Sequence, residues 1–328
     1  MTNIIEVKNL VKKYGNFTAV NNISFNLESG EFFGFLGPNG AGKTTTINIL
    51  CVLLKATSGT AVINGFDVSK EPMKVRESIG LIFQDPSVDN QLTARENLQF
   101  HGELYNVPNQ LIKKRIPEVL NTVELSDWTN RLVGTFSGGM KRRLEIARGL
   151  LHHPKVIFLD EPTQGLDPQT RNHIWQYIMK LRQDEGLTIF LTTHYMDEAE
   201  NCGRIAIIDH GEIVAMDSPA RLKAKTGEDI IFLDTDNNER AANLIESKFG
   251  IPVKRSQEGL QLEVPEGARF IPGFITSFSE TEGHPKILSI SLRRPTLEDV
   301  FIKITGRAIR QQSADAAEGQ RIAFKLQR

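Results

Sequence analysis

A glycine-rich run near the amino terminus has the spacing of a phosphate-binding loop. Residues 37–44 read Gly-Pro-Asn-Gly-Ala-Gly-Lys-Thr and follow an apolar segment at residues 32–36. This run fits the pattern G-x-x-x-x-G-K-[ST], whose glycines let successive N–H groups turn inward around β- and γ-phosphates. Lys43 would add a positive charge there, and Thr44 a hydroxyl for Mg²⁺. A helix expected over residues 44–54 would point its positive end at the same anion.

The competing interpretation of this run is a glycine-rich β-turn before an ordinary helix. The apolar, strand-like segment before the run and the helical pattern after it favour the phosphate loop.

Two adjacent carboxylates end an apolar run later in the chain. Residues 156–159 are Val-Ile-Phe-Leu, and Asp160 and Glu161 follow directly. Successive side chains of a strand point to opposite sides, so the two carboxylates can take separate roles. We expect Asp160 beside the Mg²⁺ and Glu161 toward an attacking water. The alternative is a solvated loop entry, and the apolar strand before it argues against that.

A second potential anion site begins at residue 136. Phe136-Ser137-Gly138-Gly139-Met140 opens a predicted helix with free N–H groups at its start. The apolar positions that keep helical spacing are Leu144, Ala147, Leu150 and Leu151. Ser137 taken alone could be only a helix N-cap.

The composition is that of an ordinary globular protein. The 328 residues are 40% hydrophobic and 24% charged, and this length allows two domains. A formal net charge of −1 gives no electrostatic reason to expect nucleic acid as a main partner. The only cysteines, Cys51 and Cys202, lack metal-ligand spacing, which favours a reduced cytosolic setting. No run approaches the roughly 20 apolar residues of a membrane span.

The pattern of elements predicts an α/β nucleotide-binding core. Residues 4–14 and 19–27 show the partial alternation of half-buried antiparallel strands. Short apolar runs at residues 79–83, 156–159 and 188–191 are typical of strands buried in a parallel sheet, with helical segments between them. Segments 204–209 and 211–217 predict a closing hairpin.

With these residues in view, the chain resembles the ATP-binding subunits of ABC transporters over roughly residues 4–222. Residues 137–140 match the family signature, and Gly165-Leu166-Asp167-Pro168 matches the loop that links two active sites. Tyr14 matches the aromatic residue that stacks on adenine. The signature most often ends in glutamine, whereas this chain has Met140, and we expect a tuned site because the serine and the glycine amides supply the anion contacts.

The resemblance implies an ATPase with a P-loop NTPase fold that uses ATP and Mg²⁺. Gln84 matches the glutamine that senses Mg²⁺ and the nucleophilic water, and His194 matches the switch histidine at the γ-phosphate. Without this context, Tyr14 would be an edge-strand aromatic, Gln84 a strand-end residue and His194 a core histidine. The implied catalytic residues are Glu161, His194, Lys43 and Gln84. The implied metal ligands are Thr44, Gln84 and Asp160. The implied nucleotide-binding residues are Tyr14, Gly37, Pro38, Asn39, Gly40, Ala41, Gly42, Lys43, Thr44, Thr45, Ser137, Gly138, Gly139 and Asp167.

The resemblance also implies partners. The signature of one subunit closes over the ATP held by the other, so the chain would pair head to tail with a second copy or a similar subunit. A helical subdomain at about residues 85–150 would receive a separate polytopic membrane subunit, with residues 85–91 as candidate contacts. A solvated helical face is the alternative interpretation of that segment. The chain would then work peripherally at the cytoplasmic face of the cell membrane.

A smaller domain is expected at residues 223–306, after a nucleotide-binding domain at 1–222. Strands at 230–233, 253–255, 260–264 and 287–292 and helices at 238–249 and 268–278 give a β-α-β-β-α-β order, typical of a ferredoxin-like α+β sandwich. A final helix starts at Thr296. This ending resembles exporter ATPases of the daunorubicin-resistance, polyketide-antibiotic type, which implies export. A polar, mobile tail is expected at residues 307–328.

Two other functions fit part of this pattern. A soluble ABC-type ATPase that acts on ribosomes or DNA as an assembly factor is disfavoured by the single nucleotide-binding unit and the exporter-like ending. A P-loop kinase does not account for residues 137–140 or for His194. The transported substance is not encoded in these motifs, because the family's substrate path belongs largely to the membrane subunit.

Overall fold

The computed structural model describes residues 3–84, 87–226, 229–256, 259–281 and 283–306 and divides them into two compact units. The first unit ends at Ser218, and the second begins at Pro219. The division therefore falls slightly earlier than the expected boundary at residue 222, because Pro219 begins a helix that packs within the second unit. The tail predicted at residues 307–328 lies outside the described residues.

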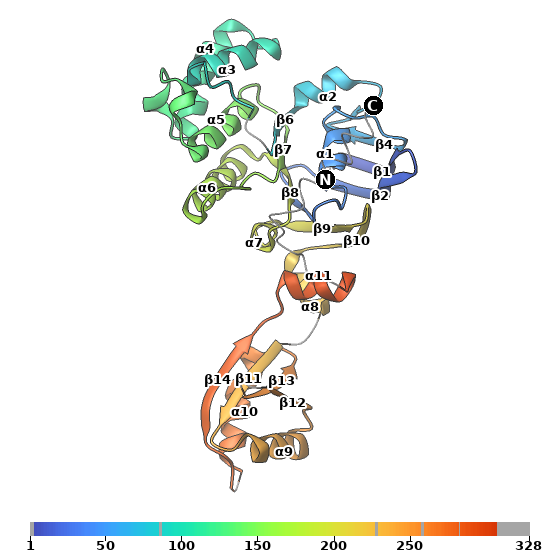
Figure 1. Cartoon of the computed structure of the whole chain (residues 1–328), viewed down its shortest axis with the longest axis vertical. Helices are drawn as coiled ribbons and strands as arrows, with labels where there is room; N and C mark the ends of the chain where they lie inside the picture. The colour runs from blue at the N-terminus through green and yellow to red at the C-terminus, as the bar shows by residue number, and fades with distance from the viewer. Residues whose placement is uncertain (1–2, 85–86, 227–228, 257–258, 282, 307–328) are drawn as a thin grey trace. The chain divides into compact units, whose positions relative to one another are not determined.

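A six-stranded sheet forms the centre of the first unit (Figure 1), in the order β10-β9-β3-β8-β7-β6. Its parallel strands are β3 (Phe32–Leu36), β6 (Ile79–Ile82), β7 (Val156–Asp160), β8 (Thr188–Thr193) and β9 (Arg204–Asp209). Strand β10 (Glu212–Asp217) is antiparallel to β9 at one edge. The residues of β3, β7 and β8 are all buried, as expected for parallel strands covered on both faces. Parallel strands end at one edge of the sheet, so the segments that follow β3, β7 and β8 meet there.

A second, antiparallel sheet packs against the central one. Its strand order is β2-β1-β4-β5, with β1 (Asn3–Tyr14), β2 (Phe17–Glu28), β4 (Ser58–Ile63) and β5 (Phe66–Asp67). Phe25 of β2 lies with its ring centroid 5.7 Å from that of Phe33 and 5.9 Å from that of Phe190. Phe158 and Phe190 are 5.3 Å apart. This aromatic cluster joins β2 to β3, β7 and β8, the strands whose ends carry the candidate site.

The helices of the first unit fall into two groups. The helices α1 (Lys43–Leu50), α2 (Pro72–Ser78), α6 (Pro168–Glu185) and α7 (Met196–Ala199) flank the sheets, whereas α3 (Ala94–Leu104), α4 (Asn109–Thr122) and α5 (Gly138–Leu150) gather together (Figure 1). Two short 3-10 turns, η1 (Ser126–Trp128) and η2 (Val133–Thr135), connect α4 to α5. Helix α1 ends at Leu50 and not at residue 54, because Val52 has a left-handed φ of 60°. The strand expected at 79–83 likewise ends at Ile82.

The second unit confirms the predicted β-α-β-β-α-β order. Its elements are β11 (Asp229–Thr235), α9 (Asn238–Phe249), β12 (Val253–Ser256), β13 (Gly259–Val264), α10 (Gly267–Ser279) and β14 (Ile287–Arg293). They form one antiparallel sheet in the order β12-β13-β11-β14, the arrangement of a ferredoxin-like sandwich. Helices α8 (Pro219–Thr226) and α11 (Leu297–Thr305) pack on each other. Within the described ranges, no helix combines the length and apolarity needed to cross a bilayer.

Candidate functional site

Tertiary packing dictates two glycines of the phosphate loop. A Cβ on Gly37 would lie 2.3 Å from the backbone oxygen of Ile208, and one on Gly42 would lie 2.4 Å from that of Ala19. Gly42 also caps α1 with a left-handed φ of 101°. From the sequence we expected Gly37 to allow a backbone conformation closed to residues with a side chain, and this was wrong. Its φ is not positive, and the close approach of β9 is what requires a glycine. Side chains at these positions would push the loop out of the concave shape that anion binding needs.

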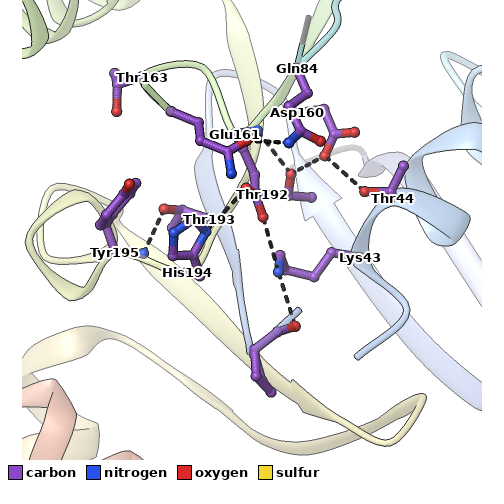
Figure 2. Close-up of polar contacts among 12 residues, drawn as sticks. Lys43, Thr44, Gln84, Asp160, Glu161, Thr163, Thr192, Thr193, His194 and Tyr195 are labelled. Carbon is purple, nitrogen blue, oxygen red and sulfur yellow. Dashed lines mark hydrogen bonds and ion pairs between the residues drawn. The ribbon is translucent and has the colours of Figure 1, made fainter. Parts of the chain in front are cut away.

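Lys43 is buried at the start of α1, with only 4% of its surface exposed. Its Nζ donates to the carbonyl oxygens of Gly37 at 2.8 Å and Pro38 at 3.1 Å, and lies 3.1 Å from Oε1 of Glu161 (Figure 2). Burial lowers the pKa of Lys43, and the charges of Glu161 and Asp160 oppose that shift. The loop thus folds around its own lysine.

Oxygen donors converge where β7 ends. Oδ1 of Asp160 accepts hydrogen bonds from Oγ1 of Thr192 at 2.5 Å and from Oγ1 of Thr44 at 3.4 Å (Figure 2). Burial raises the pKa of Asp160, and the bonds from Thr192 and Thr44 oppose the rise. Carboxylate and hydroxyl oxygens are the donors that Mg²⁺ prefers. The chemistry of the residues present therefore fits the ion that the sequence predicts, with Thr44 and Asp160 as the residues that would hold it.

Glu161 lies between two basic side chains. Its Oε1 faces Lys43, and its Oε2 lies 3.1 Å from Nδ1 of His194, without hydrogen-bond geometry between those two atoms. Burial alone would raise the pKa of Glu161, but contact with His194 and the charge of Lys43 hold it below its ordinary value. Glu161 has a positive φ of 45°, and its N–H donates to the carbonyl oxygen of Thr192 at 3.1 Å. The positive φ indicates backbone strain at Glu161. Because its pKa is lowered, its side chain is an ionised carboxylate at neutral pH.

Gln84 and Tyr14 lie at the margin of this group. Gln84 follows β6, and its Nε2 donates to Oε1 of Gln164. Among the hydrogen bonds of the described residues, none joins Gln84 to Thr44 or Asp160. Tyr14 ends β1 with 38% of its surface exposed, and its hydroxyl contacts Thr45 of α1.

The signature residues form a second cluster. Ser137 caps α5, its Oγ accepting from the N–H of Met140 at 3.3 Å. A Cβ on Gly139 would lie 2.5 Å from Cγ2 of Thr170 at the start of α6. Asp167 caps α6, its Oδ1 accepting from the N–H of Thr170 at 3.0 Å. The structure therefore brings Ser137, Gly139 and Asp167 together. Within the described part of the chain, no hydrogen bond or ion pair links them to Lys43 or Thr44.

From the sequence we did not identify Glu198, a buried carboxylate that links two segments of the site. Glu198, 1% exposed, accepts hydrogen bonds from the hydroxyls of Thr163 and Thr193, the latter at 2.5 Å. The carbonyl oxygen of Thr193 accepts from the N–H of Gly37 at 3.2 Å. Glu198 thereby joins the segments that follow Glu161 and precede His194. The available signal in the sequence was the pair Thr192 and Thr193, two hydroxyl side chains directly before His194 that need buried hydrogen-bond partners.

The arrangement combines what phosphoryl transfer to water requires. A buried lysine contacts the carbonyl oxygens of Gly37 and Pro38 in the loop, the oxygens of Thr44 and Asp160 lie at the end of β7, and the carboxylate of Glu161 contacts the lysine.

Comparisons with known proteins agree with this geometry. The family model described as "ABC transporter" matches residues 20–164. The linearmycin resistance ATP-binding protein of Bacillus subtilis (strain 168) is 39% identical, over 94% of this chain and 100% of that relative. The daunorubicin/doxorubicin resistance ATP-binding protein of Streptomyces peucetius is 38% identical, over 98% of each chain.

A solved structure adds evidence on the reaction. It is a dimeric, post-hydrolysis state of an ATP-binding cassette bound to ADP and Pi, 32% identical, with a TM-score of 0.59 over 65% of this chain and 98% of that one. The phosphate loop, the buried carboxylates and these full-length similarities have one explanation: the chain belongs to the ATP-binding, ATP-hydrolysing proteins of ABC transporters.

Proposed function

We propose that this chain powers the export of an antibiotic-like compound through a separate membrane subunit, hydrolysing ATP with the residues around Glu161. The observation that carries the site assignment is the buried contact of Glu161 with both Lys43 and His194, each at 3.1 Å. These contacts support a role for Glu161 as the carboxylate that faces both the phosphate loop and His194. The direction of transport rests on the similarity to proteins named for linearmycin and daunorubicin resistance.

In the proposed reaction the oxygen of a water attacks the γ-phosphorus of ATP, and the bond to the β–γ bridging oxygen breaks to leave ADP. Glu161 polarises that water and takes its proton, for which an ionised carboxylate is suited. His194 holds the γ-phosphate against the water. Lys43 moves from Glu161 and the loop carbonyls to the β- and γ-phosphate oxygens.

Thr44 and Asp160 are the proposed Mg²⁺ ligands, with Gln84 joining them after it releases Gln164. When bound, Mg²⁺ would supply positive charge for the phosphate oxygens. The main-chain N–H groups of residues 39, 40 and 42–45 would hold the phosphates, and Tyr14 would stack on the adenine. Thr192 keeps Asp160 in place through its 2.5 Å hydrogen bond.

The signature cluster supports a head-to-tail dimer as the working unit. Ser137, Gly138, Gly139 and Asp167 form a group without a bond to the phosphate loop among the described residues, so we infer that they serve the ATP of a second subunit. The related cassette bound to ADP and Pi is dimeric. Closure around ATP and opening after hydrolysis would then follow from the higher affinity of ATP for the closed state.

We further propose that a polytopic permease binds the first unit, which places the chain at the cytoplasmic face of the membrane. Large apolar side chains that are more than half exposed support a partner surface. In the first unit they are Phe17, Leu53, Met73, Phe100 and Leu104. Of the contacts expected at residues 85–91, residues 85–86 lie outside the described part of the chain, and Val88 is buried.

Transport in inverted membrane vesicles tests the proposal. Vesicles that contain the full chain and its co-purifying membrane protein should accumulate daunorubicin only with ATP and Mg²⁺. Lys43→Ala should abolish accumulation, whereas Lys8→Ala, which changes a lysine that is 72% exposed, should not. ATP-independent accumulation, or equal accumulation with Lys43→Ala, would refute the proposed function.

A further inference from the structure

A charged pair on α5 reaches two catalytic segments at once. Arg142 and Glu145 are 3% and 0% exposed, and Nη1 of Arg142 lies 2.9 Å from Oε2 of Glu145. Burying two charges is costly, and a buried ion pair is weak evidence for stability by itself. The remaining contacts of the pair therefore decide what it does.

Two further hydrogen bonds of Arg142 go to loop carbonyls that flank proposed catalytic residues, while its Nη2 is buried without a hydrogen-bond partner among the described residues. Its Nε donates to the carbonyl oxygen of Pro162 at 2.5 Å, and Pro162 directly follows Glu161. Its Nη1 donates to the carbonyl oxygen of Phe83, which directly precedes Gln84. One planar guanidinium therefore fixes the backbone beside both residues, and its fork of donors is the feature that lysine lacks.

Glu145 extends the same restraint to the far end of the Gln84 segment. Its Oε1 accepts from the N–H of Ser87 at 2.5 Å and from the Ser87 hydroxyl at 3.0 Å. Arg148, one turn further along α5, donates to the carbonyl oxygen of Ser87 at 2.9 Å. The segment that carries Gln84 is thus held by α5 on both sides.

The position of Arg142 along α5 links this restraint to the signature. Ser137 caps the same helix five residues earlier, about 7.5 Å along the axis at 1.5 Å per residue. A helix is stiff over this length, so a displacement of the signature end displaces Arg142 as well. The neighbouring Arg143 makes different contacts, to the carbonyl oxygen of Val123 at 3.2 Å and to the hydroxyl of Tyr177 at 3.4 Å.

We propose that Arg142, supported by Glu145, is a positioning residue that sets Gln84 and Glu161 relative to each other and reports the position of the signature helix to both. This inference rests on the proposed roles of Glu161 and Gln84. Arg142 touches neither ATP nor water in this proposal and acts through backbone carbonyls.

The test compares Arg142→Lys with Arg143→Lys in the full chain. Arg142→Lys should lower kcat for ATP about 10²-fold, the loss typical of a catalytic group displaced by about 1 Å. The Kd for ATP should change less than about threefold, because the phosphate loop is untouched. Arg143→Lys should change neither quantity. Hydrogen exchange of peptides containing Gln84 and Pro162 should rise in Arg142→Lys alone, without nucleotide.

A double variant separates positioning from general damage. In Glu161→Gln one of the two residues that Arg142 positions is already lost, so adding Arg142→Lys should slow hydrolysis by a smaller factor than it does in the unmodified chain. If Arg142→Lys does not fold, Arg142→Met combined with Glu145→Leu removes both charges of this pair, while Arg148, which loses its own contact with Glu145, keeps its hydrogen bonds to Ser87. It should fold, with the same loss of kcat and the same rise in exchange.

Unchanged kcat in Arg142→Lys, an equal loss in Arg143→Lys, or fully additive losses in the Glu161→Gln background would overturn the inference. These results leave the proposed function intact if Glu161→Gln is inactive. Normal turnover by Glu161→Gln, or no ATP hydrolysis by the unmodified chain, would instead refute the proposed function and the inference with it.

Discussion

Replacing Glu161 by glutamine should slow hydrolysis and tighten ATP binding at the same time. The substitution keeps the shape of a side chain that is 6% exposed but removes the charge that faces Lys43 at 3.1 Å. Before ATP can use Lys43, this contact must break. The neutral glutamine competes less strongly than Glu161 with the phosphates of ATP for Lys43. It also removes the carboxylate that is proposed to take the proton from water.

The size of each effect follows from the contact. At 3.1 Å and an effective dielectric constant of about 20, the attraction between Lys43 and Glu161 is about 5 kcal/mol before desolvation. A hydrogen-bonded charged pair retains about 1.5 to 3 kcal/mol net, so ATP should bind about 10- to 100-fold more tightly. Loss of the general base should lower kcat by about 10² to 10⁴-fold.

Equilibrium binding of a fluorescent ATP analogue without Mg²⁺ and steady-state phosphate release with Mg²⁺ measure the two effects. Glu118→Gln, which changes an exposed glutamate on α4, is the matched control and should alter neither. Weaker or unchanged binding by Glu161→Gln would refute the competition for Lys43. Turnover within a few-fold of the unmodified chain would refute the role of Glu161.

Three further substitutions test the fold of the two units. Gly42→Ala should cost about 1 to 3 kcal/mol of stability and lose ATP binding, because φ is 101° and the new Cβ would lie 2.4 Å from the Ala19 oxygen; thermal unfolding and nucleotide binding measure this. Burial, with a smaller contribution from nearby charges, lowers the pKa of His101 to about 3. Below pH 6.5 the unfolded state therefore binds one more proton than the folded state. The free energy of unfolding then falls by up to about 1.4 kcal/mol for each unit by which the pH drops. His101→Phe should reduce the loss of stability between pH 7 and pH 5 in urea unfolding, and an unchanged loss would contradict the shifted pKa. Thr296→Ala should destabilise the second unit by about 1 kcal/mol in thermal unfolding, because it removes the capping box with Asp299 at the start of α11.

The sequence by itself determined the parts of this protein that are encoded locally. The phosphate-loop motif lies in one contiguous run at residues 37–44. The apolar residues 156–159 before Asp160 and Glu161 predict a buried strand. Alternation and turn signals were also enough for the order of strands and helices in the second unit, which the structure confirms. These features were predictable because helix, strand and loop preferences act over a few neighbouring residues.

Tertiary structure alone decided how these parts restrain one another. Gly37 is needed because the backbone oxygen of Ile208 approaches it. The contacts of Arg142 with the carbonyl oxygens of Phe83 and Pro162 join segments far apart in the chain. The spacing of residues along the chain does not predict such contacts, because the sequence does not show whether an arginine on a helix is buried or exposed. Its partners became visible only once the chain had folded around it.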